Sequence, residues 1–372
     1  MKITGLETVF VKPRWVFLKM HTDEGIVGLG EPALEGRSQT VAAAVQEMGR
    51  FLIGEDPRMI EHNWQTVHRR QFYRGGPILS SALSGVEQAM WDILGKSVGE
   101  PVYRLLGGPT RKKIRVYRGC GGRVVDGRVP SAGEAVAEGF TAIKTGLPGA
   151  PIKYVDSLAF LEETERRFAA MRETVGPEVD IAIDFHGASS PAMSIRLAKA
   201  LEPYYPMFIE EPVLPGNVDE LVRVARSTSI PIATGERLFT KWGFREVVEK
   251  QAATILQPDL SHAGGISEVK KIAAMAECYY GSVAPHCPLG PIALAACIQL
   301  DASIPNFLIQ ELGGLGEGYL KEPFEVVEGH IELPTGPGLG IELDEEALAD
   351  KVYDGSWDHR PSLHEDGSVG DA

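Results

Sequence analysis

Short apolar runs, each closed by an acidic residue or a histidine, recur through the second half of the chain. The closing residues are Asp184, Glu210, Glu236, Asp259, His286 and Glu311. Successive closing residues are 26, 26, 23, 27 and 25 positions apart. Because this interval is the length of one strand, one helix and two short loops, it indicates a parallel β/α fold.

Two earlier apolar runs, at 114–119 and 140–145, bring the number of expected parallel strands to eight. We therefore predict the α/β class and a modified (β/α)8 TIM barrel. The carboxyl ends of its strands converge on one mouth, where the six closing residues would line a single site. One acidic residue after a strand is more often the cap of the next helix, but six in register are hard to explain as caps.

The first hundred residues follow a different pattern. Residues 15–20 and 26–31 alternate between apolar and polar around a turn at 22–25, which predicts a hairpin. Helical spacing follows at 37–53, 58–72 and 77–97. These elements predict an N-terminal α+β domain that ends near the Gly-Gly-Pro break at 107–109.

From this break we expect residues 1–108 to form the first domain and residues 109–320 to form the barrel. Apolar residues from Val155 to position 171 mostly keep helical spacing, so we expect a barrel helix there after a longer loop. The segment 321–372 is rich in Gly and Pro and then acidic. We expect it to cross the surface and pack back on the first domain, with mobility after about residue 358.

The charge balance limits the partners. Among 372 residues, 37 Lys and Arg stand against 51 Asp and Glu, a formal charge of −14. This field repels polyanions, so nucleic acid and anionic membranes are poor partners. A small anionic substrate would need local positive charge, from a metal ion or from particular lysines and arginines.

Cysteine use and hydropathy indicate the compartment. The four cysteines form no CxxC pair and are sparse for so long a chain, so no disulfide framework is indicated and a reducing cytoplasm fits best. A basic, apolar leader is not seen, and no apolar run approaches 18 residues. We therefore expect neither export nor membrane insertion.

The first three closing residues predict a metal site. Asp184, Glu210 and Glu236 would lie at neighbouring strand ends, where three carboxylates repel one another unless a cation neutralises them. Oxygen ligands favour a hard ion, so we expect Mg²⁺ rather than Zn²⁺. The alternative is a solvated acidic rim.

Two histidines predict acid and base groups beside this site. His286 would end the seventh strand and touch Asp259 after the sixth, forming a general base with the carboxylate that orients it. His186 follows Asp184 by two residues, so on an extended strand both side chains share a face. Two histidines flanking a metal suggest a β-elimination. The role of His262 stays undecided.

Several motifs together carry a family resemblance. They are DFHG (184–187), FIEEP (208–212), GER (235–237), QPDLSHAGG (257–265) and APHCPLGP (284–291). The chain resembles the enolase superfamily and, within it, the D-galactonate dehydratases. The likeness runs from the hairpin RWVFLKMHTDEG to PGLGIELDE (337–345) and covers nearly the whole chain. It implies an N-terminal capping domain, a modified barrel and a C-terminal segment that returns to the cap.

The resemblance also implies roles. Asp184, Glu210 and Glu236 would hold Mg²⁺, and the pair His286 and Asp259 would take the proton from C2 of an aldonate. His186 would protonate the departing 3-hydroxyl, and Glu311 would hydrogen-bond the substrate carboxylate. The residues expected to bind substrate are Lys144, Arg14, Trp15, Tyr73 and Arg74. Symmetric homo-oligomers, often octamers, are a further implication.

Three departures from the family pattern leave alternatives open. Gly146 stands where many superfamily members carry the second lysine of a Lys-x-Lys base, Ala188 replaces the arginine of DFHGR, and residues 312–318 are rich in glycine. The last two lie near the distal end of the substrate. The alternatives are dehydration of another sugar acid (gluconate, another aldonate or an aldarate), an epimerase, or a non-catalytic protein that binds metal and a sugar acid.

Overall fold

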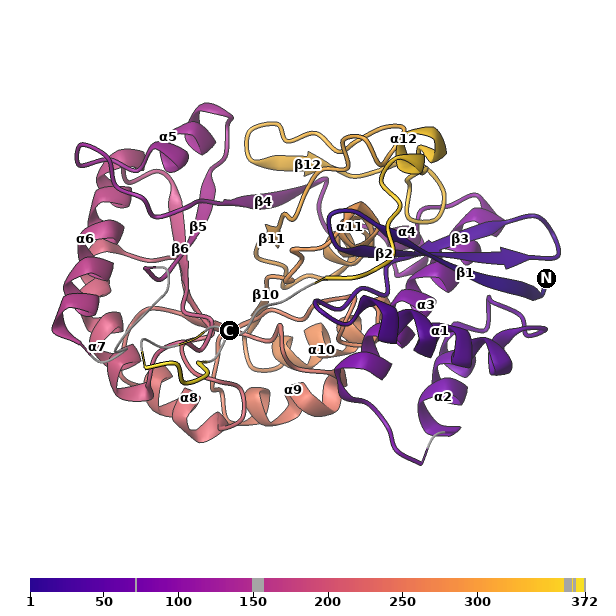
Figure 1. The fold of residues 1–372 in the computed structure, drawn as a ribbon, viewed down its shortest axis with the longest axis horizontal. Helices are drawn as coiled ribbons and strands as arrows, with labels where there is room; N and C mark the ends of the chain where they lie inside the picture. Colours follow the sequence, from indigo (N-terminus) through magenta and orange to yellow (C-terminus); the bar gives the residue numbers. More distant parts are fainter. Residues whose placement is uncertain (71, 149–156, 358–362, 364–365, 371–372) are drawn as a thin grey trace.

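Two parts, a curled parallel barrel and an N-terminal α+β domain, lie side by side in the molecule (Figure 1). A computed structural model describes residues 1–70, 72–148, 157–357, 363 and 366–370. The predicted Val155 and most residues after 358 lie outside the described residues. No described helix is long and apolar enough to cross a membrane.

Eight parallel strands make the barrel, as predicted. They are β4 (Lys113–Gly119), β5 (Ala142–Gly146), β6 (Asp180–Asp184), β7 (Ile209–Glu210), β8 (Ile232–Thr234), β9 (Ile255–Leu256), β10 (Ser282–Val283) and β11 (Gln310–Glu311). Neighbours pair in order from β4 to β10, and β11 pairs with β4. A parallel bridge between Val283 and Phe307 closes the circle. Most of the strands are shorter than the apolar runs that predicted them.

Side chains fill the interior of the barrel, which is a packed core and not a pore. Each strand, or the residue directly beside it, contributes one member. The layer consists of Tyr117, Ala142, Ala182, Phe208, Ala233, Ile255, Ala284 and Ile309. Four alanines leave room for the two aromatic rings, and the site lies above this layer at the carboxyl ends of the strands.

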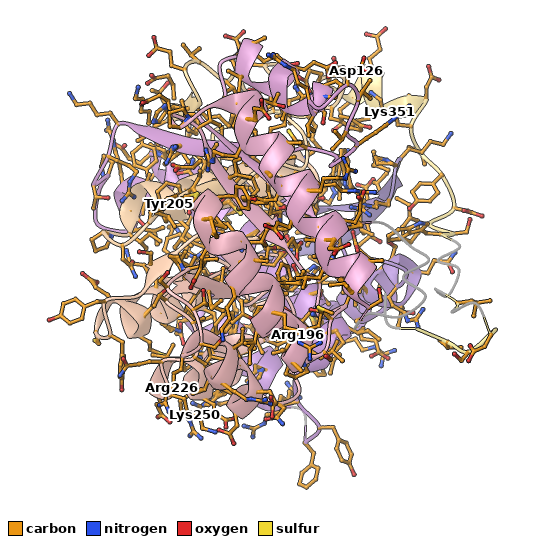
Figure 2. The ribbon with its side chains drawn as sticks, turned by 90° about the vertical axis from the view of Figure 1, so that its left-hand side faces the viewer. Asp126, Arg196, Tyr205, Arg226, Lys250 and Lys351 are labelled. Carbon is orange, nitrogen blue, oxygen red and sulfur yellow. The ribbon has the colours of Figure 1, made fainter. Side chains whose placement is uncertain are left out.

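Seven described helices cover the outside of the barrel. They are α5 (Pro130–Ala137), α6 (Leu158–Val175), α7 (Pro191–Leu201), α8 (Val218–Ala225), α9 (Thr240–Glu249), α10 (Ile266–Glu277) and α11 (Pro291–Ser303). A 3-10 turn, η1 (Glu202–Tyr204), follows α7. Charged side chains such as Arg196, Arg226 and Lys250 project from this outer surface (Figure 2).

The barrel departs from eightfold regularity after its last strand. In the described part of the chain, β11 is followed by β12 (His330–Glu332), which pairs antiparallel with the first half of β4, and not by a barrel helix. The sequence thus folds as seven strand and helix units plus an eighth strand, because residues after 311 are rich in Gly and Pro.

The N-terminal domain contains a three-stranded antiparallel sheet, β1 (Ile3–Val11), β2 (Trp15–Thr22) and β3 (Val27–Gly30). The hairpin of β2 and β3 is the predicted one, whereas β1 was not predicted, since most of its residues are only half-buried and its pattern is weak. The helices α1 (Ser38–Leu52), α2 (Ile60–Arg70) and α3 (Gly76–Val98) lie where the pattern predicts them, and the short α4 (Val102–Leu105) follows.

Helix α3 packs on this sheet so closely that only glycine fits at the contact. A Cβ atom at Gly30 would lie 1.9 Å from the carbonyl oxygen of Gly85. The close approach buries most of α3 between the sheet and the barrel.

The C-terminal segment returns to the first domain. The N–H of Leu339 donates to Asp92 of α3 (2.8 Å), and the N–H of Lys12 donates to the carbonyl of Lys351 (2.8 Å). Lys19 forms an ion pair with Glu345, in the short helix α12 (Glu345–Ala349). The domain boundaries near residues 108 and 320 stay predictions.

A buried carboxylate from the N-terminal domain caps helix α10 of the barrel. Glu87 of α3 accepts the N–H groups of Ile266 (2.7 Å) and Ser267 (2.8 Å). It also accepts from the Ser267 hydroxyl (2.6 Å) and from Trp91 Nε1 (2.8 Å). Burial raises the pKa of Glu87 to about 7. The side chain satisfies helix N–H groups that have no partner within their own helix.

Helix α11 is capped in the same way by Glu31, which follows β3. Its carboxylate accepts the N–H groups of Gly290 (2.7 Å) and Ala293 (2.9 Å), and burial raises its pKa to about 8. The two caps tie the domains together through hydrogen bonds that are shielded from water, where an unpaired donor is costly.

We predict that Glu87→Ala lowers the free energy of unfolding by about 3 kcal/mol, because it leaves several buried donors without an acceptor. Urea unfolding followed by fluorescence and circular dichroism measures the change. Glu163→Ala is the control, since Glu163 pairs with Arg166 and Arg167 on the surface, and it should cost less than about 1 kcal/mol. Equal midpoints for both variants would contradict the interdomain role of Glu87.

Candidate active site

The carboxyl ends of the strands bring the predicted polar residues to one mouth. Asp184, Glu210 and Glu311 are the last residues of β6, β7 and β11. Glu236 and His286 follow β8 and β10 within three residues. All five side chains are at least mostly buried, so their charges act on one another with little screening.

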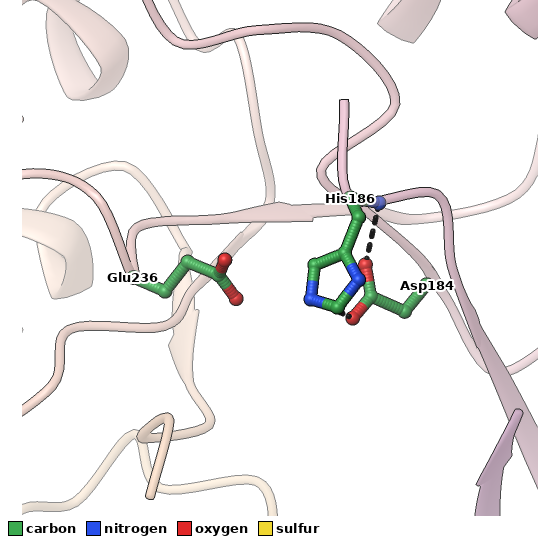
Figure 3. Close-up of side chains that lie close together, drawn as sticks. All are labelled: Asp184, His186 and Glu236. Atoms are coloured by element: carbon green, nitrogen blue, oxygen red, sulfur yellow. Dashed lines mark hydrogen bonds and ion pairs between the residues drawn. The ribbon is translucent and has the colours of Figure 1, made fainter. Parts of the chain in front are cut away.

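Two of the three predicted metal ligands lie together with a histidine. Ligand atoms of Asp184, His186 and Glu236 all lie within 4.8 Å of one another (Figure 3). Oε2 of Glu236 is buried and makes no hydrogen bond to the described residues. A buried carboxylate oxygen without a hydrogen bond beside a second carboxylate fits a divalent cation, which would supply positive charge.

Lys144 of β5 holds the third predicted ligand. Its Nζ lies 2.8 Å from Oε1 of Glu210, 2.8 Å from Oε1 of Glu311 and 3.7 Å from Oδ2 of Asp184. Burial alone would lower the pKa of Lys144, but Glu210 and Glu311 outweigh it and raise the pKa well above its usual range. A residue predicted to bind substrate thus lies among the carboxylates as their ammonium partner.

The pKa values of three carboxylates in the cluster are shifted, two of them upward and one downward. Burial raises the pKa of Glu210 to about 8, although Lys144 opposes the rise, and burial also raises the pKa of Glu236. For Glu311, burial is outweighed by Lys144 and His286, which lower its pKa to about 2. The cluster therefore holds more buried acid groups than its cations neutralise.

The predicted pair of His286 and Asp259 is formed. Nδ1 of His286 lies 2.8 Å from Oδ2 of Asp259, while its Nε2 lies 3.4 Å from Oε2 of Glu236. Burial would lower the pKa of His286, but Glu311, the hydrogen bond to Asp259 and Glu236 outweigh it and raise the pKa well above its usual range. Asp259 thus holds one ring nitrogen and leaves Nε2 facing the site.

His186 reaches Asp184 by a different geometry from the predicted one. Strand β6 ends at Asp184, and His186 has φ +51°, so it is not extended. The left-handed turn brings its N–H to Oδ1 of Asp184 (2.8 Å) and its Nε2 to 3.3 Å from Oδ2. The ring is largely exposed and faces Glu236 (Figure 3).

The four residues of the N-terminal domain that were predicted to bind substrate fall into two pairs. Arg14 donates to the carbonyl of Pro288 (3.4 Å) in the loop after His286, and the buried Trp15 ring packs against Gly290. Tyr73 and Arg74 line a hollow among α1, α2 and α3, and Tyr73 as a residue is 84% exposed. The first pair therefore contacts the loop that follows His286, whereas none of the described contacts brings the second pair to this loop.

An ion pair that was not predicted from the sequence supports Glu236. The buried Glu211 accepts from Nε (3.0 Å) and Nη2 (2.6 Å) of Arg237 and from the N–H of Gly235 (3.2 Å). It therefore holds both chain neighbours of Glu236. The signal was present in the second glutamate of FIEEP and the arginine of GER.

Comparison with known proteins defines the class. Residues 4–107 match the family model of the mandelate racemase / muconate lactonizing enzyme N-terminal domain, and residues 129–347 match the model of the enolase C-terminal domain-like family. The chain belongs to the enolase superfamily, as its sequence motifs predict.

Relatives of nearly the same length narrow the class. The chain is 46% identical to the D-galactonate dehydratase of Variovorax paradoxus (strain S110) and to that of Ralstonia pickettii (strain 12J), with 99% of each chain covered. Among solved structures, a member of the enolase superfamily from Salmonella Typhimurium has a TM-score of 0.89 at 34% identity, covering 95% of this chain and 98% of the other. An enolase from Agrobacterium radiobacter, bound to Na and L-malate, has a TM-score of 0.92 at 30% identity and full coverage of both chains.

We predict that the metal-stripped protein binds a divalent cation and that Glu236→Gln weakens binding by at least about tenfold, equal to about 1.4 kcal/mol, because it replaces an anionic oxygen with a neutral amide. Isothermal titration with Mg²⁺ measures the affinity. Glu163→Gln, on the outer surface, is the matched control. Equal affinity in the Glu236 variant would exclude this carboxylate as a ligand.

Proposed function

We propose that the chain is a Mg²⁺-dependent acid-sugar dehydratase that converts D-galactonate, or a close aldonate, to its 2-keto-3-deoxy acid. The observation that carries the proposal is the placement of two imidazoles at different carboxylates of one cluster, His186 at Asp184 and His286 at Glu236. One removes a proton and the other delivers one, as elimination of water requires. The full-length relatives named D-galactonate dehydratase support the choice of substrate.

Asp184, Glu210 and Glu236 would hold the cation. Their oxygen-rich donor set favours Mg²⁺ over softer ions. When bound, the cation supplies positive charge to the substrate carboxylate and so makes the neighbouring C–H more acidic. The buried oxygen of Glu236 that makes no hydrogen bond supports this assignment.

His286 takes the proton from C2. In its neutral form Nε2 is free to accept this proton, because Asp259 holds the hydrogen on Nδ1 and stabilises the imidazolium that forms. The electron pair of the broken C2–H bond moves into the carboxylate, giving an enediolate. The carboxylates around the ring are negatively charged, so they favour the imidazolium that forms.

His186 gives a proton to the 3-hydroxyl. The enediolate electrons form the C2–C3 double bond as the C3–O bond breaks, and the hydroxyl leaves as water. The resulting enol takes a proton at C3 and loses one from its 2-hydroxyl, which gives the 2-keto-3-deoxy acid. The exposure of the His186 ring leaves room for a substrate beside it.

Lys144 donates to the substrate carboxylate in this proposal, and Glu311 positions Lys144. Glu311 accepts hydrogen bonds from Lys144 and from the N–H of Cys287 (2.9 Å). The hydrogen bond between Glu311 and the substrate carboxylate, which the family resemblance implies, stays a prediction. An ammonium also complements the negative charge that develops during proton removal.

Residues of the N-terminal domain select among sugar acids that differ at the distal end, away from the carboxylate. Arg14 and Trp15 contact the 286–290 loop, and they are our first candidates for specificity, with Tyr73 and Arg74 as second candidates. Ala188 and the segment 312–318 differ from the family pattern, so gluconate, another aldonate or an aldarate is the alternative substrate. Assembly as a homo-oligomer and a cytoplasmic location stay predictions.

We predict that a panel of aldonates and aldarates, assayed with Mg²⁺ by semicarbazide absorbance, gives the strongest 2-keto-3-deoxy acid signal with D-galactonate. His286→Asn should lower kcat by at least about a hundredfold, because it removes the base. His21→Asn is the control, since His21 pairs with Glu7 on the sheet of the N-terminal domain. If the protein turned over a different acid instead, that acid would be its substrate. If it turned over none of the acids, a binding protein would be favoured.

For His186→Asn we predict that C2–H exchange with deuterium oxide continues while elimination slows by at least about a hundredfold. Proton NMR follows both reactions in one sample. The His286 variant should lose both. If the His186 variant instead lost exchange and elimination together, His186 would not be the acid that acts on the 3-hydroxyl.

A further inference from the structure

The turn between β9 and α10 carries the carboxylate that orients the base. Asp259 is buried, and its Oδ1 accepts the N–H of Ser261 (2.7 Å) while its Oδ2 faces Nδ1 of His286 (2.8 Å). A carboxylate held at both oxygens keeps one rotamer, which in turn fixes the plane of the imidazole.

A second imidazole faces the same carboxylate oxygen. Nε2 of His262 lies 3.7 Å from Oδ2 of Asp259, and its Nδ1 lies 2.9 Å from Oγ of Ser81 in helix α3. His262 is 7% exposed, so water does not screen it. The ring therefore lies between the N-terminal domain and the orienting carboxylate.

Hydrogen positions follow from this geometry. The Ser81 hydroxyl donates its one hydrogen to the carbonyl of Pro77 (2.7 Å), so Nδ1 of His262 carries a hydrogen and donates it to Oγ of Ser81. At 3.7 Å, Nε2 and Oδ2 of Asp259 are too far apart for a hydrogen bond, so the ring limits the movement of the carboxylate by packing beside it. Oδ2 of Asp259 thus has an imidazole on each of two sides: His286 is hydrogen-bonded to it, and His262 packs beside it.

Ser81 belongs to a buried polar face of α3 that contacts this turn. Ser84 accepts the N–H of Gly264 (2.8 Å), and Gln88 donates to the Ser261 hydroxyl (3.1 Å). Ser81, Ser84 and Gln88 recur at helical spacing, so they share one face of the helix. Among the described contacts of this face, the Ser81 contact is the one that leads to a ring beside Asp259.

We propose that His262 is a positioning residue for the base: held by Ser81, it fixes Asp259, and Asp259 then orients His286. Docking of the N-terminal domain is thereby coupled to the geometry of proton removal. The effect on rate rests on the proposed function, whereas the geometry itself is testable without turnover.

The kinetic test compares His262→Leu, His262→Gln, Ser81→Ala and Ser84→Ala. We expect His262→Leu to lower kcat by about tenfold with KM within about twofold, because outer partners of a catalytic group have effects of this size. The kinetic isotope effect of His262→Leu, measured with D-galactonate deuterated at C2, should be larger than that of the wild-type protein, because proton removal becomes slower. His262→Gln keeps an N–H donor and should recover most of the rate.

Ser84→Ala is the matched control, because Ser84 is on the same helix face and also donates to a carbonyl four residues earlier. Ser81→Ala should follow His262→Leu in direction, and Ser84→Ala should keep the wild-type isotope effect. Equal losses of kcat in the Ser81 and Ser84 variants, with unchanged isotope effects, would mean that His262 serves domain docking alone and would overturn the proposal.

A second measurement needs no substrate. In protein labelled with ¹⁵N-histidine, the Nδ1–H signal of His286 should shift in His262→Leu and Ser81→Ala but not in Ser84→Ala. An unshifted signal in the first two variants would overturn the proposal. If the wild-type protein turned over no sugar acid, the proposed function would fail, and this signal would still decide the role of His262.

Discussion

Buried negative charge at the mouth of the barrel is the constraint on which the rest of the structure depends. Asp184, Glu210, Glu236 and Glu311 converge there because parallel strands end at the same edge. Lys144 contacts three of them, and burial raises the pKa values of Glu210 and Glu236, because a buried carboxylate is costly to ionise. The divalent cation that we propose would complete the balance, and it would let a protein with a formal charge of −14 receive the proposed anionic sugar acid.

The N-terminal domain contributes to this site through the turns that it holds. Glu87 caps α10 and Glu31 caps α11, and these helices follow the loops that carry Asp259 and His286. Both members of the hydrogen-bonded pair, Asp259 and His286, are therefore supported from the other domain. His262 connects the two domains in a similar way, because its ring is hydrogen-bonded to Ser81 of the N-terminal domain. Such outer support matters because small displacements of a base have large effects on rate.

Much of this could be predicted from sequence, because the apolar runs and their closing residues repeat at one interval. The eight strands, the meeting of the carboxylates predicted to bind metal, and the pair of His286 and Asp259 follow from that repeat. Strand β1 did not, since its residues are half-buried on both faces. The turn at His186 and the contact of Lys144 with Glu311 were also missed, because backbone turns and long side-chain contacts leave no periodic pattern. Tyr73 was expected in the site from family likeness, but its side chain is exposed.

The most direct test of the central claim is proton NMR of D-galactonate incubated with the wild-type protein and Mg²⁺ in deuterium oxide. We predict that the substrate signals disappear and that those of a 2-keto-3-deoxy acid take their place, because His286 removes the C2 proton and the 3-hydroxyl leaves as water. Deuterium at C2 with the 3-hydroxyl retained in all of the product would contradict elimination. It would show instead that the same base carries out exchange or epimerisation.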